Sequence, residues 1–558
     1  MFPTDIAVAD GKVLITSRSG NGLLVFENGK KIAQIEFNAP ATSITVGGDA
    51  IYVTTSYDKG FLHKLSRKDL SVLKSIETGM GARAVELSDD GKFIYVCNQF
   101  KGDVVKIDAS TMEIVGRVDV LREPFAMALS KDGNLLYVNN FLPHQPANLD
   151  IVAADVSVVD TRTMTRTSDV KLSNGSNALR DIAVTNDGRF VLVSHNLGRF
   201  QVPTSQLQQG WMNTNAMSVI DAKTNTLLGS VLLDSPERGA AGVWGIKTTA
   251  DKIFVSHSGS HEITAIDYHA FVEKLDGYAE KENLSIDLRF LYGISQRIKV
   301  EGNGPRAMCI NGDTLYAPTY FSDHLNMLNI KDYAISAVEL NPSRIESAEQ
   351  QGERIFNDAS YCFQQWQSCN GCHPGDARTD GMNWDLLNDG VGNPKNCKSM
   401  LNAHKTAPNM ISGIRADAES AVRAGFKYIQ FTDISEEDAV KVDEYLKTLK
   451  PLPSPALVDG KLSPLAERGR QVFESEKCDA CHSGPLFTDM KMYRIGDDVE
   501  FENGWDTPSL VEVWRTAPYL FDGRAATLED LFSVHKHGIN TKISKKDMTA
   551  LVEYVKSL

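Results

Sequence analysis

One turn and three strand-like runs show the pattern that decides the fold of the N-terminal half: Asp89-Asp-Gly91, Phe93-Ile-Tyr-Val96, Val104-Val-Lys-Ile-Asp108 and Ile114-Val-Gly-Arg-Val118. Alternating β-branched and aromatic residues between Gly, Asp and Asn turns are typical of strands joined by hairpins. Related runs recur about every 40 residues or more, at Val13–Thr16, Ile51–Thr54, Leu136–Asn139, Val191–Ser194, Ile253–Ser256 and Leu315–Pro318. Seven such units between residue 3 and about 340 predict a seven-bladed β-propeller.

Two of these runs, Ile94-Tyr-Val-Cys-Asn98 and Leu136-Tyr-Val-Asn-Asn140, resemble the signature of the YVTN-type β-propellers. That resemblance implies the fold and says little about function. Three blades carry insertions, near 142–155, 198–214 and 268–293. Long loops on a rigid scaffold commonly form binding surfaces, so we expect some of them to dock the C-terminal half.

A polar residue follows the strand at one equivalent position in every blade: Ser17, Thr55, Asn98, Asn140, His195, His257 and Thr319. These side chains are expected to form a ring at one mouth of the central channel. His195 and His257 could begin a copper or iron site, because imidazole suits those metals, or they could form hydrogen bonds between blades. Arg83, Arg180 and Arg306 are also equivalent and could bind an anion or pair with acidic neighbours.

After Asn341 the strand pattern ends, and the chain contains two C-x-x-C-H pentapeptides, Cys369-Asn-Gly-Cys372-His373 and Cys478-Asp-Ala-Cys481-His482. This is the attachment signature of a c-type haem, in which two thiols bond the porphyrin and the histidine ligates iron. A zinc ribbon would need its second C-x-x-C roughly 15–20 residues away, whereas these histidines are 109 residues apart. The sequence therefore predicts two covalently bound haem c groups.

The two haem segments are copies of one module. Glu444-Tyr-Leu-Lys-Thr-Leu449 matches Glu553-Tyr-Val-Lys-Ser-Leu558, and Lys405-Thr-Ala-Pro408 matches Arg515-Thr-Ala-Pro518. Internal repetition of this extent indicates a duplicated structural unit. We therefore expect a multidomain β + α protein: a seven-bladed β-propeller at 1–340, followed by two tandem α-helical cytochrome c-type domains at 341–451 and 452–558.

Composition excludes several classes of partner. A net charge of -14 disfavours nucleic acid, whose phosphates would repel the protein. No run of about 18 apolar residues occurs, so no membrane span is expected. The start, Met1-Phe-Pro-Thr-Asp5, shows no signal peptide. Because haem c is attached outside the cytoplasmic membrane, we expect a periplasmic or secreted protein whose signal peptide has been removed.

The haem half resembles the bacterial di-haem cytochrome c peroxidase family, which includes the enzyme that matures the tryptophylquinone of methylamine dehydrogenase. The resemblance covers about 345–558 and rests on the paired C-x-x-C-H and on Thr507-Pro-Ser-Leu510, Thr516-Ala-Pro-Tyr519, Asp522-Gly-Arg524 and Thr527-Leu-Glu-Asp530. It implies one six-coordinate haem that relays electrons and one haem with an open iron face where peroxide is split.

The resemblance also implies which haem is open. The family's distal ligand, usually Met, falls at His535, so His482 and His535 would ligate the relay haem, with His537 as the alternative. Imidazole in place of thioether lowers the reduction potential, which leaves the electron donor undetermined. The equivalent position in the first module is Gly425, so His373 would ligate the open haem alone unless Met400, Met410 or His404 closes it.

The family's tryptophan and distal glutamine align with Ile411 and Ala421, so other groups must handle protons. The candidates for general acid or base are Glu419, Gln430 and Asp433. Trp384 could replace the bridging tryptophan or simply pack on haem.

Cys362 and Cys397 could form a disulfide in an oxidising compartment or remain separate thiols, and Cys97 and Cys309 are expected in the propeller core.

Three functions remain open at this point. The first is a peroxidase-type oxidoreductase, with peroxide or another small ligand at the open haem and a redox partner protein or small-molecule electron donor. The second is an electron-transfer protein with two six-coordinate haems. The third is an oxidase or dehydrogenase that acts in the propeller channel and uses the haems as its electron outlet.

Overall fold

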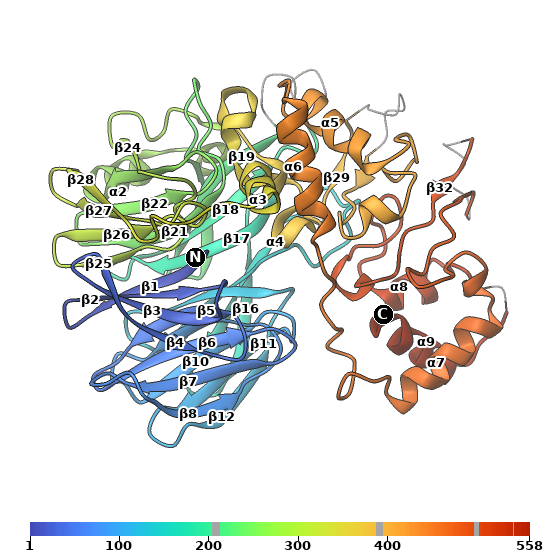
Figure 1. The fold of residues 1–558 in the computed structure, drawn as a ribbon, viewed down its shortest axis with the longest axis horizontal. Coiled ribbons are helices and arrows are strands. Elements are labelled where there is room, and N and C mark those ends of the chain that lie inside the picture. The colour runs from blue at the N-terminus through green and yellow to red at the C-terminus, as the bar shows by residue number, and fades with distance from the viewer. Residues whose placement is uncertain (203–211, 387–393, 496–501, 540) are drawn as a thin grey trace.

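The computed structural model describes residues 1–202, 212–386, 394–495, 502–539 and 541–558. Seven four-stranded antiparallel sheets follow one another, each with its strands in chain order, and neighbouring sheets contact through their first strands, including β1 against β25. This closed ring confirms the seven-bladed β-propeller (Figure 1). The first four blades are β1 (Pro3–Ala9), β2 (Lys12–Ser17), β3 (Gly22–Glu27), β4 (Lys30–Glu36); β5 (Ala41–Val46), β6 (Ala50–Ser56), β7 (Gly60–Ser66), β8 (Val72–Glu77); β9 (Ala82–Leu87), β10 (Phe93–Asn98), β11 (Asp103–Asp108), β12 (Glu113–Asp119); β13 (Pro124–Leu129), β14 (Leu135–Asn140), β15 (Asp155–Asp160) and β16 (Thr165–Lys171).

The remaining blades carry the longer strands and one of the insertions. They consist of β17 (Ser176–Val184), β18 (Phe190–Gly198), β19 (Asn213–Asp221), β20 (Thr226–Leu232); β21 (Val243–Thr248), β22 (Lys252–His257), β23 (Glu262–Asp267), β24 (Ser295–Lys299); β25 (Cys309–Asn311), β26 (Thr314–Pro318), β27 (His324–Asn329) and β28 (Ile335–Glu339). Between β23 and β24 the helix α2 (Tyr268–Gly277) and the 3-10 helix η1 (Lys281–Ile286) pack against their own blade and its neighbour.

Burial explains the strand pattern. The second strand of a blade, such as β10, is buried along nearly its whole length, whereas the outermost strand β12 is largely exposed. Both faces of an inner strand are covered by neighbouring blades, so the strand is apolar on both sides rather than alternating. Cys97 lies in this core with Val104 of its own blade and Val138 of the next blade.

Residues 341–451, called the first unit from here on, and residues 452–558, called the second unit, lie beside the propeller (Figure 1). Short helices alternate with long irregular segments, so two tandem α-helical cytochrome domains are not confirmed. The first unit contains α3 (Ala348–Asn357), η2 (Ala359–Tyr361), η3 (Phe363–Gln365), η4 (Cys369–Gly371), α4 (Pro374–Ala377), β29 (Asn383–Trp384), β30 (Lys395–Asn396), η5 (Ala403–Lys405), α5 (Ala418–Tyr428) and α6 (Glu436–Lys447). The second contains α7 (Pro464–Ser475), η6 (Cys478–Ala480), β31 (Met492–Tyr493), β32 (Trp505–Asp506), η7 (Val513–Arg515), α8 (Leu528–Ser533) and α9 (Lys545–Lys556).

The two units repeat the same helix crossing. A Cβ on Gly352 of α3 would lie 1.9 Å from the carbonyl oxygen of Lys441 in α6. A Cβ on Gly469 of α7 would likewise lie 1.9 Å from the carbonyl oxygen of Ala550 in α9. Only glycine permits backbones to approach this closely, which explains why each copy carries one at this position.

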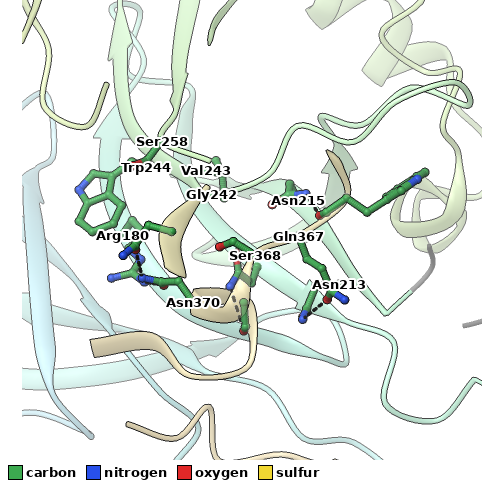
Figure 2. Close-up of a pocket in the computed structure, with 14 residues that line it drawn as sticks. Arg180, Asn213, Asn215, Gly242, Val243, Trp244, Ser258, Gln367, Ser368 and Asn370 are labelled. Carbon is green, nitrogen blue, oxygen red and sulfur yellow. Dashed lines mark hydrogen bonds between the residues drawn. The ribbon is translucent and has the colours of Figure 1, made fainter. Parts of the chain in front are cut away.

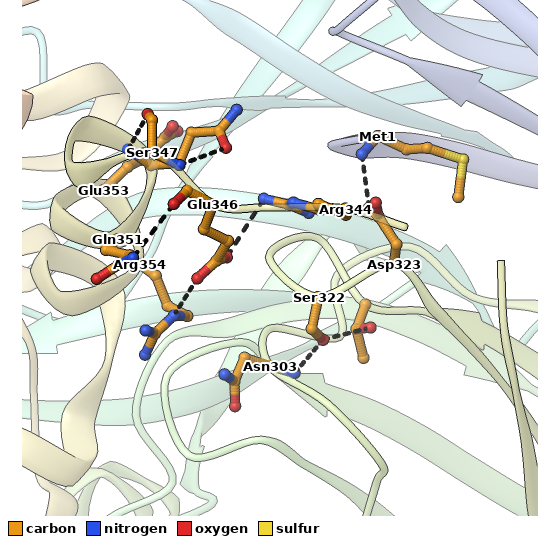
Figure 3. A network of polar contacts seen from close by, with 12 residues as sticks. Met1, Asn303, Ser322, Asp323, Arg344, Glu346, Ser347, Gln351, Glu353 and Arg354 are labelled. Carbon is orange, nitrogen blue, oxygen red and sulfur yellow. Dashed lines mark hydrogen bonds and ion pairs between the residues drawn. The ribbon is translucent and has the colours of Figure 1, made fainter. Parts of the chain in front are cut away.

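A chain of ion pairs fixes the connection between propeller and first unit (Figure 3). Arg344 donates to Asp323 of the last blade at 3.0 Å and to Glu346 at 3.3 Å, and Arg354 of α3 donates to Glu346 at 3.4 Å. Asp323 is 1 % exposed, so this network anchors the start of the haem half to the last blade.

Among the described residues, no helix combines the length and the apolar character that a membrane span needs.

Candidate haem sites

Both C-x-x-C-H motifs adopt the same local geometry. The amide of His373 donates to the carbonyl of Cys369 at 3.0 Å, and that of His482 donates to Cys478 at 2.9 Å. The Nδ1 atoms lie 3.1 Å from the carbonyl oxygens of Arg378 and Phe487, each five residues further on. A bond from Nδ1–H to a carbonyl fixes the tautomer and leaves Nε2 as the acceptor for a metal. The two thiols and one imidazole of each motif therefore fit a haem c.

In the second unit a further histidine faces the motif. The ring centres of His482 and His537 lie 6.4 Å apart with 58° between their planes. Nδ1 of His537 is buried without a hydrogen-bond partner, and burial together with the charge of His482 lowers the pKa of His537 to about 4. This separation matches one metal ion between two imidazoles, because each such bond is about 2 Å long. The donor set fits an iron ligated on both faces.

The facing residue is His537, whereas the alignment with the family gave His535. Helix α8 ends at Ser533, and Lys536 has a φ of 53°. The resulting turn brings the amide of His537 to 3.2 Å from the carbonyl of Leu531 and directs its ring toward His482. The geometry therefore favours His537, the alternative assignment, and ligation by either residue stays a prediction.

The first motif lies against the propeller. Asn213 of β19 donates to Cys372 Sγ at 3.3 Å, and Gln430 donates to Cys369 Sγ at 3.1 Å. The oxygens Asn213 Oδ1 and Gln430 Oε1 are buried without partners, so the site holds unused acceptors beside both cysteines. Cys397 Sγ lies 3.5 Å from His373 Nδ1. In the described part of the chain, no second imidazole lies opposite His373 as His537 lies opposite His482.

The three candidates for a general acid or base lie in different places: one contacts the first motif, and two lie at the surface. Gln430 is 3 % exposed and contacts the first motif, as described above. Glu419 has a 46 % exposed side chain with Lys447 at 3.8 Å, and Asp433 is exposed, so neither of these two contacts the cysteines or His373. Trp384 donates from Nε1 to Asp380 at 2.9 Å, and burial raises the pKa of Asp380 to about 7. Sequence reasoning missed Asp380, although its spacing four residues before Trp384 was visible.

Of the residues that could have closed the first site, His404 has another partner, because its Nε2 lies 3.2 Å from Asp443. Met400 and Cys369 both pack against the hydrophobic core of the first unit. Gly425 lies inside α5, which continues to Tyr428, and a Cβ there would have no neighbour within 4 Å. The helix thus continues where the second unit turns to present His537.

Two cysteines outside the motifs were candidates for a disulfide, and the two channel histidines were candidates for a metal site. Cys362 and Cys397 are separate thiols. His195 contacts the carbonyl of Asn196 at 2.8 Å and Ser218 at 2.7 Å, and His257 contacts Ala240 at 2.9 Å and Thr264 at 2.7 Å. Both nitrogens of each ring are therefore engaged, and among the described residues no three His, Cys, Asp or Glu side chains could hold a metal. This geometry favours hydrogen bonding over metal binding, but the side-chain partners Ser218 and Thr264 lie on the histidines' own blades and not on neighbouring ones as expected.

Buried charges join the two units to the propeller. Glu512 of the second unit is fully buried and accepts from Arg378 of the first unit at 2.8 Å and from Arg515 at 3.3 Å. Arg515 also lies 3.5 Å from Glu123 of the propeller. Since Arg378 supplies the carbonyl that orients His373, this network connects the first motif to the second unit.

Two haem-type motifs on a duplicated scaffold beside a propeller define a class of redox protein, and comparisons agree with that class. No protein-family model matches the chain. The chain is similar to the gamma subunit of hydrazine synthase from Kuenenia stuttgartiensis, with 25% identity over 272 residues, 37% of this chain and 76% of that protein. Cytochrome c551 peroxidase from Nitrosomonas europaea is 23% identical over 209 residues, 32% of this chain and 60% of that protein.

A solved structure of Kuenenia stuttgartiensis hydrazine synthase superposes with a TM-score of 0.53 and 19% identity, over 61% of this chain and 95% of that chain. At this identity the structural likeness shows the fold alone. Together the relatives support a haem-related redox function and an enzyme of the oxidoreductase class in general. They also confirm the resemblance to the di-haem peroxidases seen in the sequence.

Proposed function

We propose that the protein carries two covalent haem c groups and acts as a periplasmic oxidoreductase of the di-haem peroxidase type. One haem would be held by Cys369, Cys372 and His373, and the other by Cys478, Cys481 and His482 with His537 as second ligand. Haem in these positions would supply one-electron redox chemistry and, at an open iron face, activation of peroxide or another small ligand.

The observation that carries this division of roles is the asymmetry opposite the two motif histidines. An imidazole faces His482, whereas no described imidazole faces His373. The protein residues at the first motif have defined tasks. The carbonyl of Arg378 orients His373, and the unused Oε1 of Gln430 offers an acceptor for a proton on a bound ligand. Asp380 accepts a hydrogen bond from Trp384, and because burial raises its pKa to about 7, its carboxyl group could take up or release a proton near neutral pH.

Electrons would come from a redox partner protein or a small donor and pass through the second unit. Two histidine ligands lower a haem potential relative to a methionine ligand, so the donor would differ from that of a peroxidase with a high-potential relay. The propeller contributes directly to the first motif through Asn213 and therefore acts as a platform for it.

One spectroscopic experiment tests the proposal. The oxidised protein should show one high-spin and one low-spin haem by electron paramagnetic resonance, and cyanide should convert only the high-spin signal. Peroxide should then oxidise a reduced donor catalytically. Two low-spin haems that do not bind cyanide would instead support the electron-transfer protein.

A second candidate follows from the similarity to a hydrazine synthase subunit, which covers 76% of that relative. The chain would then work as one subunit of a larger haem enzyme acting on nitrogen compounds. Activity that appears only with co-purified protein partners, and not with peroxide, would favour this candidate. The channel-oxidase alternative has less support, because His195 and His257 are both hydrogen-bonded on two sides.

A further inference from the structure

Three arginines and three aromatic rings form a continuous arc at the channel mouth. The guanidinium carbon of Arg83 lies 4.1 Å from the ring centre of Phe125, and that of Arg180 lies 4.2 Å from Trp244. The guanidinium carbon of Arg306 lies 4.1 Å from the ring centre of Trp244 and 3.7 Å from that of Tyr320. Because the first strands of the blades line the channel, these residues face a common space, and Figure 2 shows Arg180 beside Trp244.

The arginines have few partners, and none of those partners is charged. Arg180 donates to Asn370 at 2.8 Å, and Arg306 donates to Ser258 at 3.2 Å and Asn357 at 3.3 Å. Arg83 makes no hydrogen bond to any described residue. Each guanidinium has five N–H donors in a planar fork, so most of these donors remain available. In the described part of the chain, no carboxylate lies within 4.0 Å of any of the three.

Two carboxylates of the first unit attract the arginines, and both are shared with other cations. Glu353 attracts Arg306 but also accepts two hydrogen bonds from Arg18. Asp376 attracts all three arginines, but also Arg18, Arg378 and Arg515. Its carboxylate lies 3.7 Å from Arg18, and its side chain is 68 % exposed. Burial and the like charges of Arg306 and Arg83 hold the pKa of Arg180 well below its usual value. Arg18 and the three arginines thus share the carboxylates of Glu353 and Asp376, so the arc has an excess of positive charge. Buried like charges that are not fully balanced are costly.

The first unit covers this arc. Asn370, the partner of Arg180, lies between the two cysteines of the first motif. Asn357 at the end of α3 bonds both Asn370, at 2.6 Å, and Arg306. A cavity of about 20 Å³ beside Arg180 is lined from both sides by residues including Asn196, Asn213 and Ser368 (Figure 2). The arginines thus lie at the boundary between the propeller channel and the first motif.

We propose that Arg83, Arg180 and Arg306 bind a small inorganic oxyanion, of the size and charge of sulfate or phosphate, at the channel mouth beneath the first motif. Arginine forks match oxyanions through paired charge-assisted hydrogen bonds. The aromatic rings hold the guanidinium groups apart and oriented, because cations stack favourably on their faces. Because Arg180 donates a hydrogen bond to Asn370, a bound oxyanion would also affect the position of Asn370 within the first motif.

The test uses the full haem-loaded protein in a chloride buffer, to which phosphate or sulfate is added while sodium chloride keeps the ionic strength constant. A ligand that binds only the native state raises the unfolding temperature in a saturable way. We expect such a rise in wild-type protein. Arg83→Gln and Arg306→Gln should each weaken phosphate binding measured by calorimetry about 10- to 100-fold, the range for loss of a charge-assisted hydrogen bond.

Arg67→Gln serves as the matched control, since Arg67 pairs with Asp10 at 2.7 Å on the outside of the propeller and should leave phosphate binding unchanged. Arg83→Lys keeps the charge without the fork and should retain part of the binding. An unfolding temperature that responds equally to chloride and phosphate overturns the proposal. So does a loss of stability in Arg83→Gln that is the same with and without phosphate, because the arginines would then only stack on the aromatic rings.

Discussion

The two motif-bearing units share a backbone design but differ in what lies opposite the motif histidine. In the second unit the chain leaves α8 at Ser533 and turns to place His537 against His482. In the first unit α5 continues to Tyr428, and the propeller covers the motif instead. The copies therefore diverged in a short segment and in their neighbours, while the helix crossings at Gly352 and Gly469 stayed the same.

If both motifs bind haem as proposed, the duplicated module would supply the frame for each haem, and the surroundings would assign each copy its task. A motif with a second imidazole suits a relay, because both iron faces would be ligated. A motif without one suits ligand activation, because peroxide chemistry at iron needs a vacant position.

Replacing the motif cysteines should reveal the largest difference between the two units. Cys369→Ala with Cys372→Ala, and separately Cys478→Ala with Cys481→Ala, should each lower the intact mass in denaturant by one haem. The first pair should also weaken packing against Asn213 of the propeller, whereas the second pair should not. A wild-type mass with fewer than two haems would contradict the assignment.

Removing the facing histidine should make the second unit resemble the first. His537→Ala should convert the low-spin signal to high spin, because His482 would lose its opposite imidazole. The matched control is His535→Ala, which should leave the spectrum nearly unchanged. If the two variants behave the other way round, the family alignment is right and the turn at Lys536 is not decisive.

Glu512 distinguishes the units by charge, since its counterpart in the first unit is Asn402. Glu512→Ala should lower the free energy of unfolding by about 3–5 kcal/mol, because Arg378 would remain buried without a carboxylate partner and Arg515 would keep only Glu123. Chemical unfolding followed by haem absorbance measures this loss. Asn402→Ala should cost far less, and an equal cost in both variants would argue against the network.

A surface ion pair repeated in both units should matter least. Lys447 lies 3.8 Å from Glu419, and Lys556 lies 2.8 Å from Glu529. Exposed pairs of this kind contribute below about 1 kcal/mol. Glu419→Ala and Glu529→Ala should therefore change stability equally little in the same unfolding assay. A large loss of peroxide turnover in Glu419→Ala alone would restore Glu419 as an acid–base group.

Features with a short period in the sequence could be predicted. The seven blades followed from alternating strands and Gly or Asp turns, because a strand buried between blades needs apolar residues along its length. The duplicated module followed from matched segments, and the motif histidines adopt equivalent geometry in both copies. The metal site considered for His195 and His257 did not receive support, because a sequence does not show which hydrogen-bond partners a ring will have.

By itself, the sequence determined the propeller, the repeat and the paired haem motifs, since these depend on local periodicity and spacing. Only the tertiary structure decided that His537 faces His482, because a single residue with positive φ, Lys536, redirects the chain after α8. It also decided that Gln430 reaches the first motif while Glu419 faces solvent, and that three arginines of separate blades meet. Such encounters join residues far apart in the chain, and their geometry depends on packing that no local pattern encodes.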